Sequence, residues 1–328
     1  MPTVLVTGAT GAAGRYVIPA LQSCGFRVRG QYSRKTGTTQ GVEWRRMNFL
    51  ESLDFHPLVE GCDAVVHLAA ELSDVSRMDR INVEATRTLL AAAQSEGVRY
   101  FGYASSIVVY GSPRQRFVDE TTPILNPYAS MARQYHAEPY MLEYARTKTL
   151  AELAIRDLNP LINVDLYRPT VVASLHRLLE AGDWTFARKF GAAYRRTQYV
   201  YAPDAAAAIA HLVVRGISLD RGQARIEAFN VCDEDCYTFR SLLDVAYKKT
   251  GDPRYRMRID LPVVLDLAKD LVKYRNVTIR YPQGMLMFSN SKLLATGFRF
   301  PTGIKSALEE ALAGYGNEHL GRGQTFPL

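Results

Sequence analysis

Cysteine is scarce in this chain: 4 of its 328 residues are cysteines, at positions 24, 62, 232 and 236. Four thiols are too few for a disulfide framework in a chain of this length, so we expect them to be reduced. Three residues separate Cys232 from Cys236, but no second Cys or His pair at zinc-binding spacing accompanies them. We therefore predict no metal site.

The chain also lacks long apolar runs. No stretch approaches the roughly 18 uninterrupted apolar residues that a membrane span needs, and the N-terminal MPTVLVTG has neither the basic region nor the cleavage site of a secretory signal. Hydrophobic residues make up 47% and charged residues 22% of the chain, close to the average for soluble proteins. We expect a soluble, cytoplasmic protein with no membrane partner.

Concentrated positive charge is missing as well. The net charge is +7, but the basic residues are scattered in pairs such as Arg27 and Arg29, so no continuous basic stripe forms. This scatter argues against a nucleic-acid partner. A positive net charge is equally expected for an enzyme that binds an anionic cofactor.

The first half of the sequence alternates short β-type runs with helical stretches. Strands are expected at residues 3–7, 27–32, 43–47, 64–67, 100–104 and 163–167, with helices between them, including residues 15–24 and 81–95. This alternation predicts an α/β fold with a doubly wound parallel sheet of the Rossmann type, covered by helices on both faces.

A glycine-rich turn follows the first expected strand. Gly8, Gly11 and Gly14 occur in TGATGAAG, after the strand VLVT and before a helical run. Glycines let the backbone approach a pyrophosphate closely, and amides at the helix N-terminus stabilise its negative charge. In this position the motif predicts a dinucleotide-binding site.

The end of the second strand indicates which dinucleotide binds. A carboxylate there would bond the ribose hydroxyls and repel a 2′-phosphate. Here Ser33, Arg34 and Lys35 follow the strand, and their hydroxyl and two cations suit a 2′-phosphate. We therefore predict NADP, with NAD as the alternative because both cations could also be ordinary loop residues.

Beyond residue 170 the alternation breaks up, without a linker rich in Gly, Pro or Ser. Helices are expected at residues 203–214, 239–249, 262–273 and 304–313, and a strand at 228–231. We predict that residues 1–170 form the dinucleotide-binding domain. Residues 171–328 would form mostly a smaller C-terminal α+β cap that binds the substrate, with some later segments returning to the first sheet.

Tyr144 and Lys148 stand four residues apart in YARTK, so a helix would project both from one face. An ammonium near a phenol lowers the pKa of the tyrosine, which lets it exchange a proton with a substrate oxygen near neutral pH. Ser105 and Ser106 follow the strand at 100–104, at the sheet edge that faces the ligand. Such serines can hold a substrate carbonyl, although they are also common turn residues.

Together these motifs resemble the extended short-chain dehydrogenase/reductases of the NAD-dependent epimerase/dehydratase family. TGATGAAG resembles the family's TGxxGxxG turn, HLAA its fourth-strand motif, INVEAT its NVxGT helix start, and LYRPT the segment that flanks the nicotinamide. Ser106 lies four residues before the Tyr110 of VVYG, where the family places its catalytic Ser or Thr. The match spans nearly the whole chain, and several loose motifs in the family's order make one specific signal.

The resemblance implies a role for each residue. Tyr144 would be the general acid/base, Lys148 would lower its pKa and hold the nicotinamide ribose, and Ser106 would orient the reacting oxygen. Asn48, where the family commonly has Asp, would face the adenine ring. The expected cofactor-binding residues are Gly8, Thr10, Gly11, Ala12, Gly14, Ser33, Arg34, Lys35, Asn48, Phe49, Leu68, Ala69, Ala70, Tyr144, Lys148 and Pro169.

Departures from the family pattern indicate the reaction. Dehydratases of the family carry an acidic pair directly after the catalytic Ser or Thr, but Ile107 and Val108 stand here, and aliphatic side chains cannot move protons. Epimerases usually carry an Asn just after the segment LYRPT, where this chain has Val171 and Val172. We predict a reductase or dehydrogenase that acts on a ketone or secondary alcohol of a small or apolar substrate.

The alternative within the family is a nucleotide-sugar epimerase, because Arg195 and Arg196 lie close enough in sequence to replace an Arg that epimerases carry. An epimerase oxidises and re-reduces one carbon without net change of cofactor, whereas a reductase consumes NADPH stoichiometrically. A third hypothesis is a redox-sensing regulator that binds the dinucleotide without chemistry. The presence of Tyr144 and Lys148 disfavours it, because such proteins commonly lose them.

Three segments carry further expectations. The insertion between residues 123 and 144 is rich in aromatics, which suits a lid over the substrate or simple packing equally well. The apolar helix at 262–273 resembles one in the caps of ketone reductases and hydroxysteroid-dehydrogenase-like members, and an ordinary core helix explains it equally. The resemblance also implies a homodimer through helices at residues 81–95 and 141–158.

Overall fold

The centre of the molecule is a seven-stranded parallel sheet. The computed structural model describes residues 1–194, 198–219, 224–235, 237–257, 268, 272, 280–281 and 283–313. The sheet consists of β1 (Thr3–Thr7), β2 (Arg27–Tyr32), β3 (Val42–Arg46), β4 (Ala64–His67), β5 (Tyr100–Ala104), β7 (Asn163–Pro169) and β10 (Ile226–Val231). Its order, β10-β7-β5-β4-β1-β2-β3, reverses between β1 and β4, the switch point at which such folds bind ligands. The predicted doubly wound Rossmann-type sheet is confirmed.

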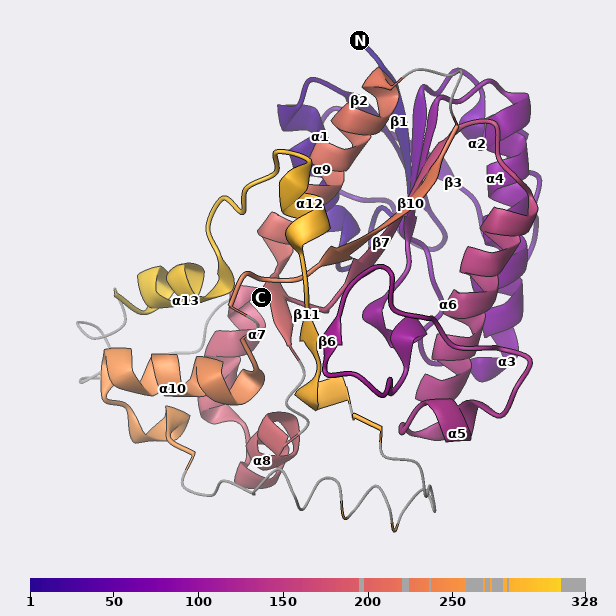
Figure 1. The fold of residues 1–328 in the computed structure, drawn as a ribbon. Coiled ribbons are helices and arrows are strands. Elements are labelled where there is room, and N and C mark those ends of the chain that lie inside the picture. Colours follow the sequence, from indigo (N-terminus) through magenta and orange to yellow (C-terminus); the bar gives the residue numbers. More distant parts are fainter. Residues whose placement is uncertain are drawn as a thin grey trace.

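Helices cover both faces of the sheet (Figure 1). α1 (Gly14–Ser23) and α9 (Ala202–Ser218) pack on one face, and α2 (His56–Val59), α4 (Ala85–Ser95) and α6 (Pro139–Asp157) pack on the other. A short α3 (Val75–Met78) and one wide π-helical turn, η1 (Asp79–Glu84), lead directly into α4. The predicted helix at 81–95 therefore begins with a π-helical turn before the regular α-helix.

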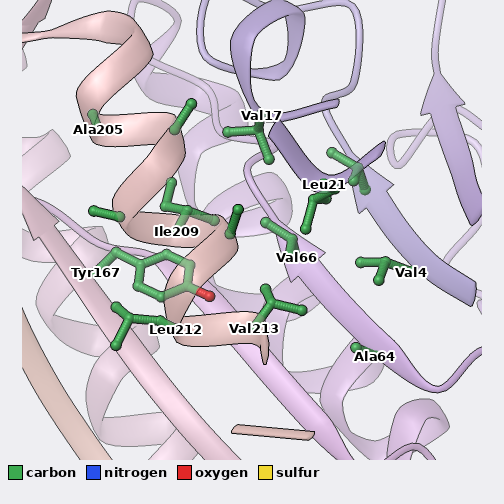
Figure 2. Close-up of a cluster of buried hydrophobic side chains, with 14 of the residues drawn as sticks. Val4, Val17, Leu21, Ala64, Val66, Tyr167, Ala205, Ile209, Leu212 and Val213 are labelled. Atoms are coloured by element: carbon green, nitrogen blue, oxygen red, sulfur yellow. The ribbon is translucent and has the colours of Figure 1, made fainter. Parts of the chain in front are cut away.

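The core explains why the central strands β1, β4 and β5 are mostly apolar. Along β1, Val4 and Val6 face α1 and α9, whereas Leu5 faces the α4 and α6 side. Figure 2 shows the cluster on the α1 and α9 face, with Val4 near Leu21 of α1 and with Leu212 of α9 on the other side of the same cluster, near Tyr167. Because both faces of a parallel sheet are buried, successive side chains on both sides must be apolar.

The remaining elements gather beside the sheet, mainly at the lower left in Figure 1. α7 (Leu175–Leu179), α8 (Phe186–Tyr194), α10 (Phe239–Thr250) and α13 (Ile304–Ala313) share one apolar cluster. Two small parallel ladders pair β8 (Val171–Ala173) with β9 (Tyr199–Tyr201), and β6 (Phe117–Val118) with β11 (Met287–Phe288). The short elements are α5 (Met131–Gln134), α12 (Ser291–Ala295) and the 3-10 turns η2 (Ile107–Tyr110), η3 (Glu180–Asp183), η5 (Pro253–Tyr255) and η6 (Gln283–Met285).

The second half of the chain contributes to the central sheet as well as to these outer elements. β10 pairs with β7 along its whole length, and α9 packs against α1. Cys236, Arg195 and Arg196 lie outside the described residues, and so does the expected helix at 262–273 apart from residues 268 and 272. No described helix is long and apolar enough to span a bilayer. The cap function of residues 171–328 and the homodimer stay predictions.

His67 is a fully buried titratable group at the carboxyl end of β4. Its Nδ1 lies 2.6 Å from Thr7 Oγ1, and its Nε2 lies 2.9 Å from Thr86 Oγ1. Burial, with a smaller contribution from the charge of Lys148, lowers the pKa of His67 to about 3. The folded protein therefore holds a neutral imidazole, and protonation would place a charge in the core.

Replacing His67 by Gln should reduce the acid sensitivity of the fold. The His67 contribution to the free energy of unfolding is complete above its unfolded pKa and declines by about 1.4 kcal/mol per pH unit as pH falls toward the folded pKa of about 3. Between pH 7 and pH 5, wild type should lose about 2 kcal/mol more than H67Q in urea unfolding. The exposed His176→Gln variant should follow wild type. Equal losses in wild type and H67Q would contradict this assignment.

Candidate active site

One large cavity, of about 1990 Å³, connects the glycine turn after β1 with α8. All three predicted catalytic residues, Ser106, Tyr144 and Lys148, line it. So do the predicted cofactor-binding residues Gly8, Thr10, Gly11, Ala12, Ser33, Arg34, Lys35, Asn48, Phe49, Leu68, Ala69, Ala70 and Pro169. Gly14 is buried and lies outside the lining. The structure thus brings residues from many separate segments to one place.

The backbone around the glycine turn leaves no room for side chains at two positions. Gly8 has a φ of +62°, and a Cβ there would lie 2.8 Å from the amide nitrogen of Ala69. A Cβ at Gly14 would lie 2.3 Å from the carbonyl oxygen of Ala9, so this glycine lets α1 pack closely on the turn. The turn opens onto the cavity through Gly8 and Gly11, and this geometry fits a nicotinamide dinucleotide.

Gln31, on β2, holds the glycine turn in place. Its Oε1 accepts a hydrogen bond from the amide of Gly8 at 2.9 Å, and its Nε2 donates to the carbonyl of Met47 at 2.6 Å. The side chain is buried and lines the cavity. Sequence reasoning did not find this residue; a polar side chain within an otherwise buried strand is the signal that could have revealed it.

The end of β2 places three polar residues at the cavity rim. Ser33, Arg34 and Lys35 are exposed there, and no carboxylate follows β2 among the described lining residues. Asn48 also lines the cavity, but its side chain is part of a local turn, with Nδ2 donating to Glu51 at 2.9 Å and Oδ1 accepting from the Leu50 amide at 3.1 Å.

α6 brings Tyr144 and Lys148 to the end of β5. Lys148 is 1% exposed, and its Nζ donates to the carbonyl oxygen of Ala104 at 2.6 Å. The same Nζ lies 5.8 Å from the centroid of the Tyr144 ring. Ser106 stands two residues after Ala104, and its Oγ accepts from the Val108 amide at 3.3 Å. The predicted catalytic residues are therefore neighbours across α6 and the β5 end.

Burial dominates the electrostatics of this site. It lowers the pKa of Lys148 to about 7, against an opposing effect from the carboxylate of Glu152. Burial also raises the pKa of Tyr144. Lys148 Nζ is bonded to the Ala104 carbonyl, and desolvation disfavours the charged forms of both Lys148 and Tyr144. Tyr144 is therefore a neutral phenol near pH 7. That Lys148 lowers the pKa of Tyr144 stays a prediction.

A buried polar network lies directly behind these residues. Glu152, one turn after Lys148, forms a bidentate pair with Arg168 at the end of β7, with N–O distances of 2.6 and 2.9 Å. Ser105 Oγ donates to Glu152 at 2.5 Å, and Arg168 donates to the Tyr110 hydroxyl at 2.8 Å. The exposed fractions of Glu152 and Arg168 are 0% and 2%. Sequence reasoning did not find this pair, because its members come from separate segments.

Replacing Glu152 by Gln should destabilise the protein by about 3–5 kcal/mol, because it leaves the buried Arg168 charge uncompensated. Urea unfolding measures this loss. The control is Glu143→Gln on the same helix, where the partly exposed Glu143 pairs with Arg146. That variant should lose about 1 kcal/mol or less. Similar small losses in both variants would show that the buried pair is not a main support of the fold.

The aromatic-rich insertion forms part of the cavity wall. Tyr135, His136 and Tyr140 line the cavity, together with Met141 at the start of α6. Tyr128 is 81% exposed and lies outside the lining. The insertion therefore contributes wall residues from α5 to α6, whereas its role as a lid stays a prediction.

Comparison with known proteins decides the family. Residues 4–232 match the model of the NAD dependent epimerase/dehydratase family. The chain belongs to this family. A short-chain dehydrogenase/reductase superfamily protein from Agrobacterium tumefaciens, solved with bound NAD, is 26% identical, with a TM-score of 0.68 over 95% of this chain and 97% of that chain. The chain is therefore an NAD(P)-dependent enzyme of the extended short-chain dehydrogenase/reductase type, as predicted.

Two curated relatives differ in the activity that their names state. "Sterol demethylase protein B" of Methylococcus capsulatus is 25% identical, over 95% of this chain and 97% of that protein. "UDP-glucose 4-epimerase" of Rhizobium leguminosarum bv. trifolii is 29% identical, over 48% of this chain and 51% of that protein. The chain is thus similar to proteins whose names state different substrates. These names do not identify its own substrate, which must be inferred from the residues of the cavity.

Proposed function

We propose that the enzyme interconverts a ketone and a secondary alcohol on a small or apolar substrate, with Tyr144 as the proton donor and acceptor. The observation that carries the proposal is the convergence of Ser106, Tyr144 and Lys148 with the glycine turn on one cavity. A nicotinamide dinucleotide supplies or accepts hydride when bound.

Each catalytic side chain has a task that follows from its surroundings. Burial raises the pKa of Tyr144, which keeps the phenol protonated and able to give its proton to a carbonyl oxygen. The hydroxyl of Ser106 can donate a hydrogen bond to the same oxygen. Lys148 is held by the Ala104 carbonyl at the cavity wall, where its ammonium would bind the nicotinamide ribose.

The cavity offers little support for a dehydration. Ile107 and Val108 stand beside Ser106 in the wall, where the dehydratases carry their acidic pair. The carboxylate of Glu71 also lines the cavity, but it accepts hydrogen bonds from the amides of Leu72 and Ser73. Burial acts to raise the pKa of Glu71, but the hydrogen bonds together outweigh it and lower the pKa. Glu71 is therefore a poor proton donor near neutral pH.

The other side of the cavity supports an apolar substrate. Its wall includes the apolar side chains Val171, Val172, Trp184, Tyr199 and Met285. Apolar walls favour ligands with apolar bodies, because both surfaces leave water on binding. The likeness to the sterol demethylase protein B along nearly the whole of both chains also supports a bulky apolar substrate.

Replacing Tyr144 by Phe should lower kcat for ketone reduction by about 10²-fold or more, because the proton donor is lost. NADPH binding, measured by fluorescence titration, should change little, since Phe keeps the ring. The control is Tyr128→Phe, whose side chain is exposed and lies outside the lining of the cavity. A Y144F enzyme that keeps wild-type kcat would refute the assigned role of Tyr144.

We further propose that NADP(H) is the preferred cofactor, because Arg34 and Lys35 stand at the rim where a 2′-phosphate would lie. Replacing both by Ala should weaken NADPH binding by about tenfold or more and leave NADH binding nearly unchanged. Calorimetric titration with both cofactors tests this. Arg27→Ala, exposed at the opposite end of β2, is the control. Equal losses for NADPH and NADH would argue against 2′-phosphate recognition.

A nucleotide-sugar epimerase is the second candidate, favoured by the likeness to the Rhizobium UDP-glucose 4-epimerase. A bound nicotinamide dinucleotide would then take a hydride from one carbon and return it, while the same three residues move the proton and position the substrate. Turnover separates the two candidates, because a reductase consumes one NADPH per product and an epimerase consumes none.

A further inference from the structure

α8 presents a mostly small-residue face to the cavity. Its lining residues are Ala187, Arg188, Gly191 and Ala192, which recur at helical spacing along one side of the helix. A Cβ placed on Gly191 would meet no atom within 4 Å. This face therefore leaves open space beside the helix, and Arg188 is the one long side chain of the four.

An aromatic stack holds the guanidinium of Arg188. Its Cζ lies 3.9 Å from the centroid of the Trp184 ring, and Trp184 stacks on Phe239 with a centroid distance of 5.3 Å and an interplanar angle of 14°. Phe239 is buried at the start of α10, which anchors the stack. A guanidinium held over a ring face keeps N–H groups that can bind a carboxylate bidentately.

Within the part of the chain that the structure describes, no acid neighbours the charge of Arg188. Among the described residues, no carboxylate oxygen lies within ion-pair distance of its guanidinium. The neighbouring cations differ: Arg254 pairs with Asp183 and Asp252, and Lys189 Nζ donates to the carbonyls of Gly182 and Arg254. Arg188 is thus a positioned cation on the cavity wall.

We infer that Arg188 binds a carboxylate on the substrate, at the end remote from the reacting carbon. The inference rests on the proposed function for the reacting carbon itself, and it narrows the substrate to an oxo acid or hydroxy acid with an apolar body. Val172, Tyr199 and Met285 line the same cavity, where they would contact the apolar body of the substrate. A single cation suits a monoanion, whereas a phosphate is usually bound by several donors.

Matched pairs of acids and esters test the inference. The probes are ω-(4-acetylphenyl)alkanoates of increasing chain length and their methyl esters, assayed with NADPH. At the best length, wild type should reduce the acid with a kcat/KM about tenfold or more above that of its ester, because a hydrogen-bonded charge pair forms. In Arg188→Met the acid-to-ester ratio should fall to near one, and Arg188→Lys should keep part of it. The exposed Arg87→Met, which lies outside the lining, should keep the full ratio.

Fluorescence separates failure of this inference from failure of the proposed function. Trp44 and Trp184 are the two tryptophans of the chain, so Trp184 is the single reporter in a Trp44→Phe background. The acids should quench Trp184 in this background but not after Arg188→Met, even if no ketone is reduced. Equal kcat/KM for acid and ester at every length, or a ratio that survives Arg188→Met, would overturn the inference. A lower NADPH affinity of the Arg188→Met variant, together with an unchanged acid-to-ester ratio of kcat/KM, would also overturn the inference.

Discussion

The buried pair of Glu152 and Arg168 joins α6, which carries Tyr144 and Lys148, to the sheet. Removing two charges from water costs several kcal/mol per ion, and here bidentate contact and hydrogen bonds with Ser105 and Tyr110 offset that cost. Ser105 adjoins Ser106, and Glu152 follows Lys148 by one helical turn. The pair therefore sets how α6 lies against the end of β5, and with it the relative positions of the predicted catalytic side chains.

The network extends from this pair into the second half of the chain. The Tyr110 hydroxyl donates to Asn230 at 2.8 Å, at the end of β10, and the Asn230 side chain donates to the Ser289 carbonyl at 3.1 Å. Strand ends that are far apart in sequence are thereby tied together beneath one cavity. Burial also raises the pKa of Tyr144. The phenol therefore keeps its proton, which is the form that the proposed ketone reduction needs.

The sequence allowed the parts of this architecture that depend on local patterns to be predicted. The strands are short β-type runs whose ends coincide with the structure within a few residues, and Gly8 and Gly14 are required by the backbone around them. Tyr144 and Lys148 share a helix face because of their spacing alone. Their convergence with Ser106 on one cavity follows from the order of parallel strands, which the alternating pattern indicates.

The rest depends on contacts between distant segments, which no local pattern records. In the sequence, Glu152 cannot be distinguished from an ordinary charged residue on a helix surface. Only the folded chain shows that it is buried against Arg168. The spacing of Tyr144 and Lys148 likewise does not show that Lys148 is buried and bonded to the Ala104 carbonyl. Nothing in the sequence around Arg188 indicates that it stacks on Trp184 at a cavity wall.

The central claim is that hydride moves between the nicotinamide and a substrate carbon in this cavity. The most direct test is isotope transfer from NADPH deuterated at C4, with each face labelled in a separate reaction, to an apolar ring ketone. The account predicts one deuterium on the carbinol carbon of the product, delivered from one face. NADPH oxidation without deuterium in the product would contradict it, as would conversion of a nucleotide sugar to its epimer with no label taken up.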